Sequence, residues 1–129
     1  LEEITNKKEI PVLTPMGLNK ENNPYNINAD TASGAVAKAL NSRRLLLMTN
    51  VEGVYDKNKI LMPEITTAEA NRMIDEKIIV SGMIPKINTC IDAVKNGVRG
   101  VVIIDGRKKH SILYEIFSDK GAGTLIRQW

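Results

Sequence analysis

The sequence predicts an α/β fold, in which an open, mainly parallel sheet is flanked by helices. Continuous apolar runs at residues 45–48 and 101–104 are typical of strands buried on both faces of a sheet. Between these runs lie longer segments with apolar residues at helical spacing, and short loops join the two kinds of segment. The 129 residues are enough for one domain with one core, and no internal repeat is visible.

The first half of the chain offers regular elements around a polar turn. Residues 10–13 are short and apolar, which suits a strand, and residues 17–23 are rich in glycine and asparagine, which suits a turn or hairpin. Residues 29–41 are expected to form a helix, because their apolar positions recur at helical spacing. After the strand at 45–48, Gly53 and residues 56–59 mark loops.

The second half continues the alternation of helices and strands. Thr66 and Glu69 have the spacing of a capping box, which predicts that a helix begins there. A further helix is expected from about Ser81 to Gly97, since its isoleucines and valine form one apolar stripe. The remaining expected elements are a strand at 101–104, a helix at 111–117 and a last strand at 124–126.

Composition excludes several classes of protein. No apolar run approaches the roughly 20 residues that span a bilayer, and no secretory leader is visible, so we expect a cytoplasmic protein without a membrane partner. The single cysteine, Cys90, excludes an internal disulfide, and its place beside an apolar helix face predicts a packed, unreactive thiol. One histidine and one cysteine predict no metal site. A net charge of +3, with scattered basic residues and few aromatics, argues against nucleic-acid binding.

Two charged residues at expected helix starts are candidates for chemistry. Asn26, Asn28 and Asp30 alternate in YNINAD, so in an extended segment they would face one side; alternatively the segment is a polar loop that caps the next helix. Lys86 follows Pro85 in the first turn of its helix, where an ammonium is unfavourable unless an anion is bound there. The other interpretation is a lysine that points into water. By themselves these residues indicate an anion-binding domain, with phosphotransfer as one use.

Six segments carry a resemblance to a known family. The chain resembles the C-terminal half of the acetylglutamate kinases, a group within the amino acid kinase superfamily, over nearly all of residues 10–126. The resemblance implies the ATP-binding lobe of a two-lobed kinase that phosphorylates the side-chain carboxylate of N-acetyl-L-glutamate in arginine biosynthesis, using ATP with Mg²⁺. The matching segments are IPVLTPMG, YNINADTASGAVAKAL, LLLMTNVEGVYD, EITTAEANRMIDEKIIVSGMIPKINTCIDAV, VVIIDGR and HSILYEIFSDKGAGTLI.

The resemblance also implies roles for individual residues. Lys86 would steady the transferring phosphoryl group, Asp30 would orient the catalytic lysines, and Asn26 and Asn28 would contact acetylglutamate. The ending resembles the arginine-inhibited, hexameric branch, although Val102 stands where relatives often have histidine and Asn50 where aspartate is usual. The implied nucleotide-binding residues are Asn50, Val51, Gly53, Val54, Tyr55, Ile78 and Ile79, and the implied L-arginine effector residues are Glu115 and Gly121.

The N-terminal, acetylglutamate-binding lobe of that family has no counterpart in the sequence. We therefore expect residues 1–129 to be the C-terminal lobe of a longer protein. We also expect that the chain alone does not catalyse the kinase reaction. Two other interpretations stay open. The lobe could belong to a glutamate 5-kinase or carbamate kinase type of enzyme, or it could be a non-catalytic arginine-sensing or assembly module.

Overall fold

The fold is built on a mixed four-stranded sheet. The computed structural model describes residues 1–129, and the strand order is β3 (Leu45–Thr49), β7 (Val101–Asp105), β8 (Gly123–Arg127) and β6 (Glu64–Thr66). The pairs β3–β7 and β6–β8 are parallel, and only β7–β8 is antiparallel. The predicted class, an α/β fold with a mainly parallel sheet, is confirmed.

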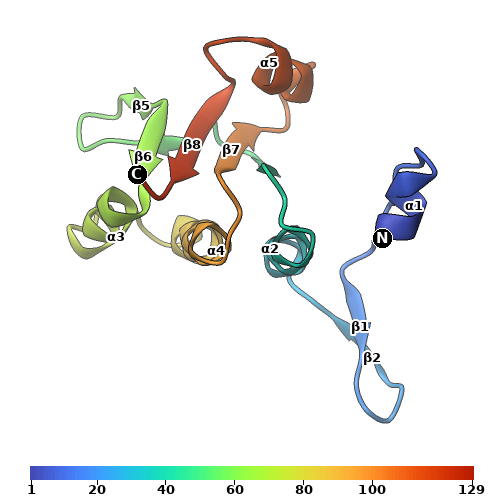
Figure 1. The fold of residues 1–129 in the computed structure, drawn as a ribbon. Helices are drawn as coiled ribbons and strands as arrows, with labels where there is room; N and C mark the ends of the chain where they lie inside the picture. The colour runs from blue at the N-terminus through green and yellow to red at the C-terminus, as the bar shows by residue number, and fades with distance from the viewer.

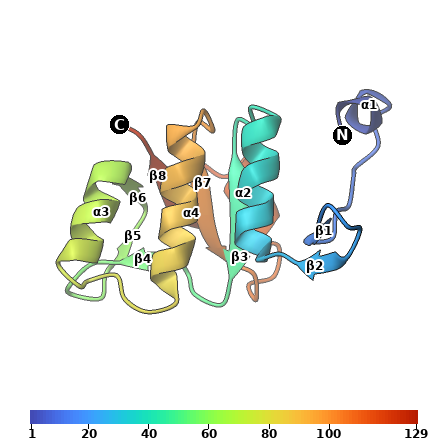
Figure 2. The same ribbon diagram turned by 90° about the horizontal axis from the view of Figure 1, so that it is seen from below.

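Helices cover the two faces of the sheet unequally. The helices α2 (Ala29–Ala39), α3 (Thr67–Asp75) and α4 (Met83–Lys95) lie on one face, and the short α5 (Ser111–Phe117) lies on the other (Figure 1). Figure 2 shows α4 between α3 and α2, with the sheet behind them. None of these helices is long and apolar enough to cross a membrane.

The core lies between α4 and the central strand β7. Ile87 and Cys90 of α4 and Val101 and Ile103 of β7 are fully buried, because the apolar stripe of the helix faces the apolar side of the strand. Burial raises the pKa of the Cys90 thiol to about 12, so the thiol stays protonated at neutral pH. The predicted packing of Cys90 is confirmed.

The predicted helix starts rest on local hydrogen bonds. The Thr66 hydroxyl accepts from the Glu69 backbone N–H at 3.1 Å, and the Glu69 carboxylate accepts from the Thr66 N–H at 2.8 Å, which confirms the capping box of α3. The next helix begins at Met83, slightly later than expected, and places Pro85 in its first turn as predicted.

Small elements lie outside the main sheet. The helix α1 (Glu2–Asn6) and the hairpin of β1 (Met16–Leu18) and β2 (Pro24–Asn26) lie to one side of α2 (Figure 2), and the predicted hairpin is confirmed. A second hairpin consists of β4 (Val54–Tyr55) and β5 (Leu61–Met62). The strand predicted at 10–13 is wrong: these residues have no strand partner, and Ile10 and Val12 are about nine-tenths exposed.

The strand β3 differs from expectation in its surroundings. It forms where predicted, but it lies at the edge of the sheet, because β7 is its only neighbour in this chain. Only Leu47 is buried, and Met48 is 47% exposed. The expected burial on both faces is therefore wrong for β3, whereas all five residues of β7 are buried as predicted.

Candidate functional site

An ion pair joins the N-terminal parts of α2 and α4. The Lys86 Nζ lies 2.6 Å from the Asp30 Oδ2, and the two side chains are only 14% and 28% exposed. The two residues are 56 positions apart in sequence. The sequence-predicted contact between a carboxylate and an ammonium, each near the start of its own helix, is thus present.

Close packing of the two helices brings these charges together. A Cβ on Gly34 of α2 would lie 3.0 Å from the Thr89 Cγ2 of α4, so glycine allows the helices to approach closely. Further along the same interface, the Lys38 Nζ lies 2.5 Å from the Asp92 Oδ2. The helix α2 therefore contributes an acid at one end and a base at the other, and α4 provides the opposite charges.

The backbone at the start of α4 is less open to an anion than the sequence suggests. The N–H groups of Met83 and Ile84 donate to the carbonyls of Val80 and Ser81 at 3.2 and 3.1 Å, and Pro85 has no N–H. The N–H groups of the first turn are therefore not free to bind an anion together with the Lys86 ammonium. In front of the helix, Gly82 borders open space, where an added Cβ would meet nothing within 4 Å.

The YNINAD segment combines both interpretations that the sequence allows. The Asn28 Oδ1 accepts from the Thr31 N–H at 3.1 Å, so Asn28, and not Asp30, is the N-cap of α2. Asp30 already belongs to the helix, so the expected extended alternation does not reach it. Asn26 ends β2 and is exposed. The Nδ2 group of Asn28 makes no hydrogen bond and is free to contact a ligand.

The segment after β3 is fastened to the sheet by one hydroxyl. The Thr124 Oγ1 accepts from the Val54 N–H at 2.8 Å and donates to the Met62 carbonyl at 2.6 Å. Gly53 passes so close to this hydroxyl that a Cβ there would collide with it. A side chain of β8 thus bonds to both strands of the hairpin that follows the expected nucleotide-binding residues Asn50 and Val51.

The other expected nucleotide-binding residues differ in accessibility. Val54 and Ile79 are 2% and 4% exposed and belong to the core, so a ligand would reach only their backbone. The N–H groups of Ile78 and Ile79 both donate to the Met73 carbonyl, which leaves their own carbonyls free. The Tyr55 hydroxyl donates to the Glu52 carboxylate at 3.0 Å.

A charged cluster at the carboxyl end of β7 was not predicted as a site. Arg107 forms hydrogen bonds of 2.8–2.9 Å with both oxygens of the buried Asp105, and these bonds lower the pKa of that carboxyl to about 2. Lys108 pairs with Glu52, and this contact lowers the pKa of Glu52. The cluster connects the loop after β3 to the loop after β7. The Asp-Gly pair directly after a buried strand was the sequence signal for it.

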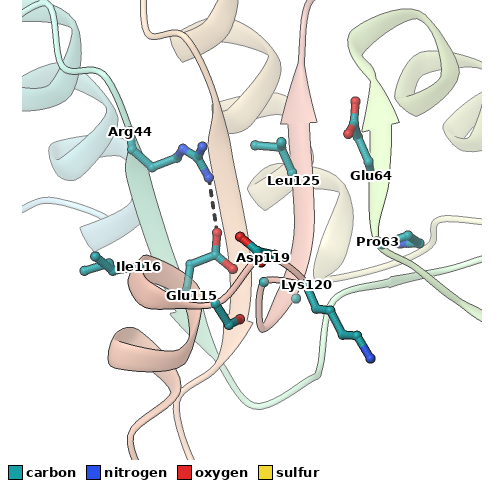
Figure 3. A pocket seen from close by; sticks show the side chains of 11 residues that line it. Arg44, Pro63, Glu64, Glu115, Ile116, Asp119, Lys120 and Leu125 are labelled. Carbon is teal, nitrogen blue, oxygen red and sulfur yellow. Dashed lines mark hydrogen bonds and ion pairs between the residues drawn. The ribbon is translucent and has the colours of Figure 1, made fainter.

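A polar pocket of about 420 Å³ lies on the α5 side of the sheet (Figure 3). The Glu115 side chain is only 6% exposed and accepts from the Arg44 guanidinium at 3.2 Å and from the Ala122 N–H at 2.7 Å. Gly121 has a φ of +68°, and a Cβ there would lie 2.9 Å from the Glu115 carboxylate. The structure thus brings the two expected effector residues into one pocket.

One further lining residue indicates that the pocket is incomplete. The Ser118 Oγ is buried and makes no hydrogen bond, although buried hydroxyls are almost always paired. Val102, by contrast, is buried within β7 and does not line this pocket. Across the chain, no three His, Cys, Asp or Glu side chains gather as a metal site would require.

The sequence matches a known protein family. The family model "Amino acid kinase family" matches residues 1–105, and the chain belongs to this family. Acetylglutamate kinase from Pelagibacter ubique is 54% identical over 128 residues, 99% of this chain and 44% of that protein. Acetylglutamate kinase from Methylobacterium nodulans is 49% identical over 99% of this chain and 42% of its own length.

Solved structures support the same fold. The N-acetylglutamate synthase from Neisseria gonorrhoeae, complexed with coenzyme A and L-arginine, superposes with a TM-score of 0.92 at 23% identity. The match covers 99% of this chain and 30% of that one, and at this identity it shows the fold alone. The chain spans less than half the length of the curated relatives named above.

Proposed function

We propose that the chain supplies the ATP-binding half of an acetylglutamate kinase active site. The reaction transfers the γ-phosphoryl group of ATP to a side-chain carboxylate oxygen of N-acetyl-L-glutamate, which forms an acyl phosphate and releases ADP. The observation that carries the proposal is the partly buried Lys86–Asp30 pair in a chain 54% identical to an acetylglutamate kinase. The product of this reaction is an intermediate on the route to arginine.

The proposed roles follow from charge. Phosphoryl transfer spreads negative charge over the phosphoryl oxygens, so catalysis depends mainly on positioned positive charge. The Lys86 ammonium is that charge, and Asp30 is a positioning acid that holds the ammonium 2.6 Å away and prevents it from turning into solvent. The open space beside Gly82 leaves room for the phosphates in front of α4.

Substrate and nucleotide contacts are assigned to neighbouring segments. We assign the side-chain amide of Asn26 and the Nδ2 group of Asn28 to the acetylglutamate, since both residues precede the helix that carries Asp30. Residues 50–55 and the carbonyls of Ile78 and Ile79 are assigned to the adenine and ribose. The chain presents no cluster of acidic side chains for Mg²⁺, so the ion would be held chiefly by the ATP phosphates and water.

The remainder of the active site belongs to a second, N-terminal lobe in this proposal. The edge strand β3, which has the composition of a central strand, provides an unpaired edge toward such a lobe. The complete protein would be a homo-oligomer of the hexameric type. The chain alone is proposed to bind nucleotide weakly and not to turn over.

A coupled assay of ADP release tests the catalytic proposal. The chain alone should give no acetylglutamate-dependent turnover, whereas a chimera that adds the N-terminal part of the Pelagibacter ubique relative should be active. In the chimera, Lys86→Met should lower kcat by about 10²–10³-fold, as loss of one transition-state charge contact does.

The matched control is Lys38→Met, which removes the other lysine–aspartate pair between the same two helices. This variant should keep kcat within about twofold, because loss of an exposed pair costs little. Equal losses in both variants would reduce Lys86 to a structural role. Turnover of the isolated chain at an ordinary kinase rate would refute the half-site proposal.

A panel of acceptors on the active chimera separates the related enzymes. Acetylglutamate should be the preferred acceptor, whereas preference for glutamate or carbamate would indicate a glutamate 5-kinase or carbamate kinase type. For the isolated chain, calorimetry with ATP and with arginine tests the remaining alternative. Binding of arginine without binding of ATP would favour an arginine-sensing module.

The polar pocket supports a second, regulatory role. We assign it to L-arginine, because a buried carboxylate, an unpaired hydroxyl and a polar wall suit a guanidinium-bearing amino acid. Glu115→Gln should abolish arginine binding in calorimetry, and Gly121→Ala should weaken it through the close approach to Glu115. Unchanged arginine binding in Glu115→Gln would place the effector elsewhere.

A further inference from the structure

The pocket assigned to arginine already holds a guanidinium that belongs to the chain. Arg44 lies between α2 and β3, and its guanidinium points at the Glu115 carboxylate in Figure 3. This contact has the same chemistry that a bound arginine side chain would make. The question is therefore whether Arg44 assists a ligand at this site or competes with it.

The burial of Glu115 points to competition. One carboxylate oxygen, Oε2, accepts from the Ala122 N–H at 2.7 Å, and the other, Oε1, accepts from Arg44 at 3.2 Å. Because the Glu115 side chain is 94% buried, few directions of approach to Oε1 are open. A ligand guanidinium would therefore approach Oε1 from the side on which Arg44 lies, and would compete with Arg44 for this oxygen.

The Arg44 contact is suited to exchange. It is a single hydrogen bond of 3.2 Å, longer than the usual 2.7–2.9 Å of charged pairs, and the Arg44 side chain is 45% exposed. Such a partly exposed pair contributes little free energy, and the released guanidinium can return to water. The buried carboxylate meanwhile stays paired in both states, so neither state leaves an uncompensated charge.

We infer that the Arg44 guanidinium occupies the place at Glu115 that the guanidinium of the effector would take, and we call Arg44 the stand-in. The effector must displace the Arg44 guanidinium from Glu115 in order to bind. This inference rests on the assignment of the pocket to a guanidinium ligand. The stand-in lowers the apparent affinity of the pocket and so sets the effector concentration at which the pocket fills. It also keeps Glu115 neutralised while the pocket is empty.

A ligand without a carboxylate isolates the competition. Ethylguanidinium carries only the guanidinium group, so a released Arg44 gains nothing from it, whereas arginine offers a carboxylate for a new pair. Binding to the 129-residue chain is followed by NMR titration. Removing the competitor in Arg44→Met should tighten ethylguanidinium binding about fivefold, the worth of a partly exposed ion pair, and tighten arginine binding less.

Arg43→Met is the matched control, because Arg43 is the neighbouring arginine, is exposed and makes no ion pair. It should leave both affinities unchanged, while Glu115→Gln should abolish binding of both ligands. In the unmodified chain, the Arg44 side-chain N–H signal should shift as ethylguanidinium is added. This last measurement needs no variant and holds even if Arg44→Met fails to fold.

The outcomes distinguish competition by Arg44 from the existence of the effector site at Glu115. If binding depends on Glu115 but Arg44→Met leaves ethylguanidinium affinity unchanged or lower, the stand-in is refuted while the effector site stands. A static Arg44 signal during saturation of a Glu115-dependent site refutes it as well. If neither ligand binds in a Glu115-dependent way, the effector site itself is wrong, and the stand-in falls with it.

Discussion

At the scale of single residues, the chain resolves unfavourable charges by pairing them between elements. Lys86 near the N-terminal end of a helix meets the positive end of the helix dipole, and Asp30 compensates it at 2.6 Å. Asp105, buried at the end of β7, is compensated by Arg107 in the same way. Both pairs consist of side chains of this chain alone, and each fixes the position of the charge that it compensates.

The pairing of Asp105 predicts a dependence of stability on pH. Its pKa of about 2 in the folded chain is below the ordinary 3.8, so the unfolded chain takes up the proton first. The stabilisation is present above about pH 4 and is lost as the pH falls toward 2. Asp105→Asn should remove this part of the pH dependence of the free energy of unfolding, measured with urea.

Asp119→Asn is the control for that experiment, since Asp119 is exposed and makes no ion pair. It should leave the difference in stability between pH 4 and pH 2 nearly as it is in the unmodified chain. If both variants show the same pH dependence, the Asp105–Arg107 pair does not control the loss of stability between pH 4 and pH 2.

How far the sequence predicts the site depends on the range of the interaction. The Asp30–Lys86 contact could be expected because both residues carry helix-start signals and parallel βαβ units bring such starts together. The cap at Asn28 instead of Asp30 is a shift of two residues, smaller than a pattern can specify. The Lys108–Glu52 and Arg44–Glu115 pairs join segments that lie far apart in the sequence, and no local pattern reports them.

At the scale of elements, the packing of α2 on α4 sets the geometry of the proposed catalytic pair. The crossing depends on Gly34, where an added methyl group would press on the Thr89 side chain at 3.0 Å. In an exposed helix, glycine-to-alanine stabilises by about 1 kcal/mol. At this position the steric contact opposes that gain.

A double-mutant cycle measures how much the steric contact between position 34 and Thr89 reduces the gain in stability. Gly34→Ala alone should stabilise the chain by clearly less than about 1 kcal/mol, because the methyl group displaces α2 from α4. Thr89→Ser removes the contacting methyl group, so in that background Gly34→Ala should recover most of the expected gain. Additive effects in urea unfolding would mean that the two helices are not in limiting contact.

The elements that the sequence missed are those whose cause is tertiary. The strands β4, β5 and β6 are only two or three residues long, too short for a periodic pattern, and each has a partner strand beside it. Residues 10–13 show the opposite case. Their composition suits a strand, but they have no partner strand in this chain and do not form one. Strand formation needs a pairing partner as well as propensity.

At the scale of the whole molecule, one side of the sheet and the N-terminal segment expose apolar surface. Ile10 and Val12 are about nine-tenths exposed, and Met48 on the edge strand is nearly half exposed. Large exposed apolar areas beside an open strand edge promote association. We expect the isolated chain to bind a hydrophobic dye and to self-associate.

A paired substitution tests the role of the N-terminal segment. Ile10→Ser with Val12→Ser should change the free energy of unfolding by less than about 0.5 kcal/mol, since neither side chain is buried. The same change should reduce dye binding and association, followed by light scattering. A large loss of stability would show that these side chains pack in the folded chain after all.

The Thr124 hydroxyl has a consequence for the order of events during synthesis. The hairpin that follows residues 50–53 is bonded to this hydroxyl, and β6 has no sheet neighbour except β8. In a growing chain on the ribosome, residues 54–66 therefore cannot form their hydrogen bonds to β8 until residues 123–127 have emerged, some sixty positions later. Nascent chains released before that strand would lack the bonds that hold residues 54, 62 and 64–66.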